Sequence, residues 1–151
     1  IQAKRGEKVV LNFGEVLDFD GNFYNENFRT AKGETVTYIC SGEKDFFKPG
    51  YSFQGFRYVR IDEYPDVEID LSAFRAIVVH SEMERLGHFA CGDEKINQLY
   101  HNILWGQKGN YLDIPTDCPQ RDERLGWTGD AQVFAKTAAY NFNVKKLLNF
   151  T

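Results

Sequence analysis

The 151-residue chain has little that would mark a membrane, nucleic-acid-binding or disulfide-linked protein. It has no apolar run near the roughly 20 residues that a membrane-spanning helix requires, so we expect no membrane partner. With a net charge of −4 and no basic patch, it is a poor candidate for binding nucleic acid. Its cysteines, Cys40, Cys91 and Cys118, are odd in number and too widely spaced to predict a disulfide framework or a zinc site. We therefore expect three free thiols, no metal site and no cofactor.

The two ends of the chain lack the signals of natural termini. The sequence opens at Ile1 without an initiator Met or a secretory signal, and residues 147–151 contain neither Gly nor Pro to stop the last helix. We expect the chain to be a piece of a longer protein, and the compartment stays open.

Apolar residues, by contrast, are plentiful, and in the first half they follow a β pattern. Hydrophobic residues make up 42% of the chain and aromatic residues 15%, which is enough for a packed core. Short runs rich in Val, Ile, Tyr and Phe predict strands at residues 8–14, 35–40, 56–62, 66–70 and 74–81. Alternation in "TVTYIC" is typical of a strand. Many short strands between turn signals favour an antiparallel β-sandwich, with residues 18–33 as a loop or short hairpin.

After about residue 90 the apolar residues recur at helical spacing. Asp93 is placed to cap a helix over residues 94–111. A second helix is predicted from Gly129–Asp130 to the end of the chain, with an apolar stripe made of Val133, Phe134, Thr137, Ala138, Leu147 and Leu148.

The predicted organisation is a β-sandwich module over residues 1–82, a linker over 83–92 and a helical region over 93–151. Two amphipathic helices cannot bury their apolar faces alone. We therefore expect them to pack against the sandwich or against further helices outside this chain, and exposed apolar surface of this kind makes self-association of the chain a further option.

The segment "PTDCPQRDERLGWTGDAQ", residues 115–132, gathers charges of both signs around one tryptophan. Pro115 and Pro119 exclude a regular helix, and Gly126 and Gly129 loosen the other end. The charges are therefore predicted to lie on a loop between two helices, where a rigid scaffold can position reactive groups.

These residue types suit the cleavage of a glycosidic bond, which needs one carboxylic acid to protonate the leaving oxygen and a second carboxylate to activate water or attack carbon. Repulsion among the four carboxyls of Asp117, Asp122, Glu123 and Asp130 favours keeping one of them protonated. Aspartate and arginine grip vicinal hydroxyls, and the indole of Trp127 can cover the apolar face of a sugar. Composition alone favours the other interpretation, a solvated loop with weak ion pairs, with Trp127 in the core and Asp130 as a helix cap.

A resemblance decides between these two interpretations. The stretch "TDCPQRDERLGWTGDAQVFAKTAAYN" resembles the signature segment of bacterial α-L-rhamnosidases, glycoside hydrolase family 78. Upstream, "FQGFRYVRI" and "VVHSEMERLGHFACGDEKINQLYHNILWGQKGN" are similar to the same family, so that nearly the whole chain is covered. Departures are slight, such as Gln54 where the family would have His, and none lies in the charged segment.

The resemblance implies an antiparallel β-sandwich module followed by the first α-helices of an (α/α)6 catalytic barrel. It implies that the parent protein releases terminal α-L-rhamnose from rhamnose-containing carbohydrates with inversion. On matching positions, Glu123 would be the general acid, and Asp117, Arg121 and Asp130 would hold sugar hydroxyls. Trp127 would line the pocket, and Asp122 would bind substrate or support the loop.

The general base of the family is a glutamate much later in the barrel, beyond residue 151, so we expect this chain alone to be inactive and to need the remainder of the parent chain. Two other functions stay open. One is a non-catalytic carbohydrate-binding β-sandwich with an exposed aromatic row at Phe23, Tyr24 and Phe28, and the other is a purely structural module that uses "FRYVRI" to dock the barrel.

Overall fold

The structure is a computed structural model that describes residues 1–28 and 34–150. The chain divides into two compact units. One, the β unit, comprises Ile1–Ile77 together with Gln120–Asp122, and the other, the helical unit, comprises Val78–Pro119 and Glu123–Thr151. An antiparallel β module followed by α-helices is the fold class expected from the sequence, and it is confirmed.

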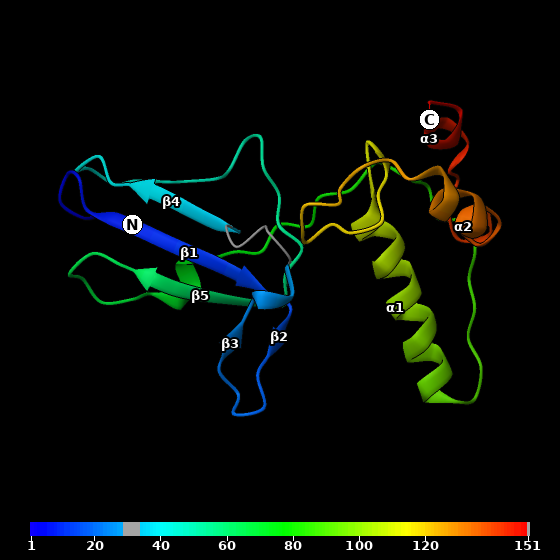
Figure 1. Ribbon diagram of the computed structural model, residues 1–151, viewed down its shortest axis with the longest axis horizontal. Helices are drawn as coiled ribbons and strands as arrows, with labels where there is room; N and C mark the ends of the chain where they lie inside the picture. Colours follow the sequence, from blue (N-terminus) through cyan, green and yellow to red (C-terminus); the bar gives the residue numbers. More distant parts are fainter. Residues whose placement is uncertain (29–33, 151) are drawn as a thin grey trace. The chain divides into compact units, whose positions relative to one another are not determined.

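The β unit is built on a three-stranded antiparallel sheet in the order β4-β1-β5. Strand β1 (Lys8–Gly14) runs along the middle, with β4 (Thr35–Ile39) and β5 (Tyr58–Glu63) on its two sides (Figure 1). Inward and outward residues alternate along β4, where Val36 and Tyr38 are partly buried and their neighbours are exposed. This alternation is the pattern that the sequence predicted.

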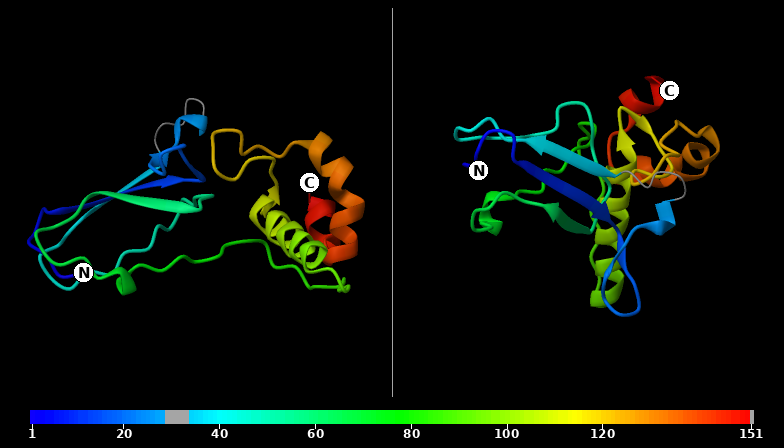
Figure 2. Two further views of the ribbon diagram at one scale, coloured as in Figure 1. Left: turned by 90° about the horizontal axis from the view of Figure 1, so that it is seen from below. Right: turned by 60° about the vertical axis from the view of Figure 1, so that its left-hand side comes forward.

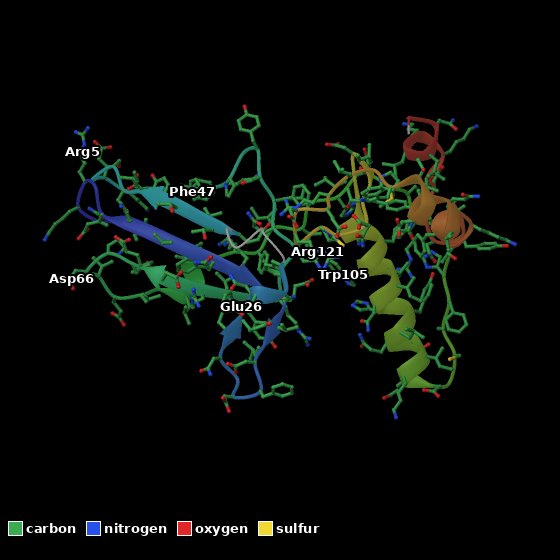
Figure 3. All side chains as sticks on the ribbon, in the orientation of Figure 1. Arg5, Glu26, Phe47, Asp66, Trp105 and Arg121 are labelled. Atoms are coloured by element: carbon green, nitrogen blue, oxygen red, sulfur yellow. The ribbon has the colours of Figure 1, made fainter. Side chains whose placement is uncertain are left out.

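Aromatic and apolar side chains pack on this sheet in small clusters. Ala3, Val9 and Cys40 are buried together, and burial raises the pKa of the Cys40 thiol. Tyr38 stacks on Phe47 with ring centroids 4.7 Å apart, and Phe47 is labelled beside β4 in Figure 3.

The turn-rich segment after β1 contains the short hairpin that was predicted as one option. Strands β2 (Val16–Leu17) and β3 (Phe23–Tyr24) pair, and the 3-10 helix η1 (Glu26–Phe28) follows. The rest of that segment, residues 29–33, lies outside the described residues.

Two predicted strands are wrong. Residues 66–70 form bends and coil, because Asp70 turns back to accept a hydrogen bond from the backbone N–H of Ser72 at 2.9 Å and caps the 3-10 helix η2 (Leu71–Ala73). Residues 74–81 carry the apolar composition of a strand but make no strand ladder with the described residues.

The helical unit begins with α1 (Glu94–Asn110), whose cap was predicted correctly: the Asp93 carboxylate accepts from the backbone N–H of Lys95 at 2.8 Å. The single helix predicted after it is wrong. Instead α2 (Thr128–Asn141) ends at Asn141 with Phe142 as its cap residue, and α3 (Lys145–Phe150) begins after a break. No helix of the described residues is long and apolar enough to cross a bilayer.

Tertiary pairing explains the break. The backbone at Phe142 is extended and bridges to Arg85, and the Asn143 N–H donates to the Glu84 carbonyl at 2.8 Å. Phe142 and Val144 are thereby buried in the core of the helical unit, which places α3 beside α2 in both views of Figure 2. Local helix preference is outweighed by burial of these two side chains.

The predicted apolar stripe on the second helix is only partly correct. Ala138 is fully buried, and Phe134, Leu147 and Leu148 pack against the core, whereas Val133 is 86% exposed and Thr137 is exposed. The described helices therefore bury one narrow face and leave apolar residues uncovered.

Gly87 is predicted to be essential for the packing of the helical unit. A Cβ atom there would lie 2.1 Å from the Tyr140 carbonyl oxygen, and its N–H donates to the Asn141 carbonyl at 3.1 Å. We expect Gly87→Ala to lower the free energy of unfolding by about 1–3 kcal/mol, as overpacking does. The matched control is Gly92→Ala, since a Cβ there meets nothing within 4 Å. Chemical denaturation of the two variants tests this, and equal stabilities would contradict it.

The Arg60–Asp62 pair on β5 is predicted to make stability depend on pH. The Arg60 Nε lies 2.5 Å from Asp62 Oδ1, and this bond holds the pKa of Asp62 below its usual value. The stabilisation is therefore present above about pH 4 and is lost as the pH falls through the lowered pKa. Because the pair is partly exposed, we expect Asp62→Asn to cost less than about 1 kcal/mol at pH 7 and nothing at the acid end.

Denaturation midpoints of Asp62→Asn from pH 7 downwards, with the exposed Asp66→Asn as control, check this. A cost that stayed constant with pH would show that the Arg60 bond is not its source.

Candidate active site

A short hairpin fixes where the charged loop begins. Strands β6 (Tyr111–Leu112) and β7 (Ile114–Pro115) directly follow α1 and pair across Asp113, whose φ of 62° is in the left-handed region that aspartate tolerates. The Asp113 N–H donates to Ser81 Oγ at 2.8 Å, and the Thr116 N–H donates to the Asn110 carbonyl at 2.8 Å. These bonds set the direction in which the chain enters the loop.

The far end of the loop is fixed by the first turn of α2. Trp127 is the residue before the helix and provides no side-chain cap, and Asp130 lies in the first turn. A carboxylate there is favoured by the positive end of the helix dipole. Trp127 is 46% exposed. The solvated-loop interpretation predicted that Trp127 lies in the core, and that prediction is wrong.

The loop brings two of the predicted carboxyls together. One ligand atom from each of Asp117, Cys118 and Glu123 lies within 4.8 Å of the others, and the three side chains are partly buried. The Cys118 thiol donates to Asp117 Oδ2 at 3.4 Å. Two carboxylates and a thiolate could hold a divalent cation, since three protein ligands are the usual set of a catalytic zinc site. The same closeness also suits proton donation by one of the carboxyls.

A cavity of about 610 Å³ lies beside this cluster in the helical unit. Its lining comes from α1, the β6–β7 hairpin and α2, and includes three of the predicted residues, Asp117, Trp127 and Asp130. A volume of this size is typical of small-molecule sites. Glu123 is outside this lining and is connected to it through Asp117.

Arg121 and Asp122 are not brought into this cavity. Their contacts group them with the β unit, Arg121 being partly buried and Asp122 exposed. Figure 3 labels Arg121 on the loop between β7 and α2.

The sequence did not point to Asn110 or Tyr111, which also line the cavity. They stand at the end of a helix with nothing in the local pattern to mark them. Only the burial of their polar atoms distinguishes them, and burial is a property of the fold.

Carboxyl groups, a half-exposed indole and a cavity of about 610 Å³ thus lie at or beside one loop, and comparisons with known proteins assign the chain to a family. Residues 1–80 match the bacterial alpha-L-rhamnosidase concanavalin-like domain, and residues 84–151 match the bacterial alpha-L-rhamnosidase 6 hairpin glycosidase domain. The chain belongs to the bacterial α-L-rhamnosidase family.

Individual relatives support this assignment over most of the chain. An alpha-L-rhamnosidase of Formosa agariphila is 43% identical over 97% of the chain, and one of Streptomyces avermitilis is 40% identical over 98%. A solved S. avermitilis alpha-L-rhamnosidase, complexed with L-rhamnose, superposes with a TM-score of 0.92 at 39% identity over 99% of the chain. The chain spans only 16% and 14% of the two curated relatives and 14% of the solved one.

The three cysteines are predicted to react with a thiol reagent in the order of their exposure. Cys91 is exposed, Cys118 is partly buried beside Asp117, and Cys40 is 1% exposed with a pKa that burial raises. Because the thiolate is the reactive form, we expect Cys91 to be alkylated first and Cys40 only on unfolding. Peptide mapping after timed alkylation measures this order, and early labelling of Cys40 would contradict the packing of the β unit.

Proposed function

We propose that this chain is part of an enzyme that hydrolyses terminal α-L-rhamnosides with inversion of configuration. The observation that carries the proposal is the pairing of Glu123 with Asp117 beside a cavity in the region that matches the glycosidase domain. The relatives in Formosa agariphila and Streptomyces avermitilis are alpha-L-rhamnosidases, which supports the substrate class.

Glu123 is the proposed general acid, protonating the glycosidic oxygen as the bond breaks. Its side chain is partly buried, which keeps it accessible to a substrate while removing it from bulk water. One of its carboxylate oxygens lies within 4.8 Å of the Asp117 carboxylate, so the two groups face the same part of the loop.

The remaining loop residues are proposed to hold the sugar. Asp117 and Asp130 line the cavity and would accept hydrogen bonds from vicinal hydroxyls of the sugar. Arg121 would donate hydrogen bonds to the oxygens of these hydroxyls. Trp127, with almost half of its surface exposed, would cover the apolar face and the methyl group of rhamnose. Asp122 is exposed and would support the loop or contact substrate at its edge.

The carboxyl spacing supports a general base elsewhere in the parent protein. Inverting enzymes place their two carboxyls about 6.5–9.5 Å apart so that water fits between them. Asp117 and Glu123 approach within 4.8 Å, which is too close for that pair. The base of an inverting reaction therefore has to come from another residue, and we propose a glutamate outside this chain.

The closeness of the two carboxyls also allows retention with Asp117 as nucleophile, a mechanism in which the two carboxyl groups lie about 5–5.5 Å apart. The two mechanisms release opposite anomers. Proton NMR of the first product of the parent enzyme distinguishes them, since inversion gives β-L-rhamnose first.

The architecture of the parent is proposed to follow the sequence expectation: a β-sandwich module over residues 1–82, a linker over 83–92 and the start of the catalytic barrel over 93–151. Leu99, Val133 and Tyr140 are 58%, 86% and 68% exposed on α1 and α2. Further barrel helices of the parent chain would cover them, and without these helices self-association of the chain is the expected outcome.

The observed packing disfavours the carbohydrate-binding module as an alternative. Its aromatic row needed Phe23, Tyr24 and Phe28 on the surface, but Phe28 is 1% exposed and the Arg60 guanidinium lies 4.6 Å from the Phe23 ring. Only Tyr24 stays exposed, at 37%. The docking role suggested for "FRYVRI" is not supported at Arg60, which pairs with Asp62 on the same strand.

Glu123→Gln in the parent enzyme is expected to lower kcat by about 100-fold or more on a rhamnoside with a poor leaving group, because general acids contribute this much. A nitrophenyl rhamnoside, whose leaving group needs less protonation, should lose much less. Steady-state kinetics on both substrates measure the difference, with Glu94→Gln, an exposed acid at the start of α1, as control. Equal losses on the two substrates would argue against acid catalysis by Glu123.

The isolated 151-residue chain is expected to release no nitrophenol from nitrophenyl α-L-rhamnoside above the rate in buffer, because the proposed base lies outside it. A continuous absorbance assay at high protein concentration tests this. Turnover that Glu123→Gln abolished would show that the base lies within the chain.

A further inference from the structure

Tyr111 is a buried side chain of the cavity lining to which no role has been assigned. It opens β6, is 3% exposed, and its carbonyl accepts from the Ser81 N–H at 2.8 Å. Its ring meets Phe134 of α2 edge to face at 6.3 Å. The ring is therefore fixed from two elements, and its hydroxyl has a defined position.

That hydroxyl is buried and has no hydrogen-bond partner among residues 1–28 and 34–150. A buried polar group in this state is destabilising and is rare unless something pairs with it. Burial also raises the pKa of Tyr111, so the phenol keeps its proton and remains a donor at neutral pH.

Two acceptor atoms of the same cavity lining, Asn110 Oδ1 and Asp117 Oδ1, are also buried without a hydrogen-bond partner among the described residues. In each case the other half of the group is engaged: Asn110 Nδ2 donates to the Gly106 carbonyl at 2.8 Å, and Asp117 Oδ2 accepts from Cys118. Within the described residues, the cavity lining thus carries one buried donor and two buried acceptors without partners, and a bound hydroxyl would reach them after a small local shift. A hydroxyl group donates and accepts at once, and a neutral polyol matches this set, whereas an anion would meet the two acceptors unfavourably.

We infer that Tyr111 is a sugar-binding residue: its hydroxyl donates to a hydroxyl oxygen of the sugar held in this cavity, and Asn110 Oδ1 accepts from a neighbouring hydroxyl. This assignment rests on the proposed function, since it takes the ligand to be the rhamnosyl group. In addition to the proposed sugar contacts of the charged loop, it assigns a polar contact from the junction of α1 and β6.

The test is Tyr111→Phe in the parent enzyme, which removes the hydroxyl and keeps the ring against Phe134. We expect kcat/KM for a rhamnoside and the affinity for free L-rhamnose to fall about five- to tenfold, as for loss of one neutral hydrogen bond. The melting temperature should stay the same or rise, because the unpaired hydroxyl is gone from the folded protein. Tyr51→Phe, at a fully exposed site in the β unit, is the matched control and should change neither quantity.

Monodeoxy analogues of L-rhamnose, used as competitive inhibitors, identify the contact. One of them should bind the wild type and Tyr111→Phe equally, because the bond it lacks is the one the variant has already lost. If all analogues show the same ratio between the two enzymes, the phenol contacts no hydroxyl and the inference is wrong.

The remaining outcomes also decide it. A Tyr111→Phe enzyme with unchanged kinetics and affinity would overturn the inference, and so would a variant that melts lower or fails to fold, since its hydroxyl would then be bonded within the protein. A wild-type parent that neither cleaves rhamnosides nor binds L-rhamnose would instead reject the proposed function.

Discussion

A buried pair of amides, Gln107 and Asn141, holds the helical unit together. Asn141 Nδ2 donates to Gln107 Oε1 at 3.0 Å, and Gln107 Nε2 donates to the Ala138 carbonyl at 3.2 Å. Both side chains are almost completely buried, so losing either partner would leave an unpaired amide in the core. The bonds join α1 to the end of α2, where the small side chain of Ala138 lets the helices approach. The walls of the cavity belong to these two helices and to the hairpin between them, and their spacing depends on this pair.

Because α1, α2 and the hairpin between them are held in place, both ends of the charged loop are fixed. The β6–β7 hairpin sets its start, and the first turn of α2 sets its finish, so Asp117 and Asp130 approach the cavity from opposite ends of one segment. A loop tethered in this way can hold like charges near each other, because the backbone at each end is already bonded and cannot relax to separate them. A segment that is polar enough to be a solvated surface is thereby given fixed side-chain positions, as the proposed site requires.

The sequence predicted what local patterns decide. Strand β4 follows from alternation, and the Asp93 cap of α1 follows from a side chain that bonds the nearby backbone. The charged loop follows from its prolines. The break before α3 could not be predicted, because it depends on pairing of Phe142 with Arg85, far away in the chain. The apolar run at residues 74–81 was wrongly predicted as a strand, because a strand also needs a neighbouring strand to pair with, and composition does not show whether one is present. The sequence did not indicate Tyr111, because the absence of a hydrogen-bond partner for its buried hydroxyl, within the described residues, can be seen only in three dimensions.

The amide pair and the polar atoms of the cavity lining differ in how completely their hydrogen bonds are satisfied, and this difference has a cost in free energy. The same unit that bonds Gln107 and Asn141 completely leaves three polar atoms of Asn110, Tyr111 and Asp117 without a partner in the described chain. Each such atom costs about 1–3 kcal/mol, against a total stability of about 5–15 kcal/mol for a typical domain. A packing defect of that size would be a large fraction of the stability. In the proposed site, a ligand that bonds all three atoms would regain this energy on binding, and the bonds to Asn110 and Tyr111 would add to the affinity that the loop carboxyls supply.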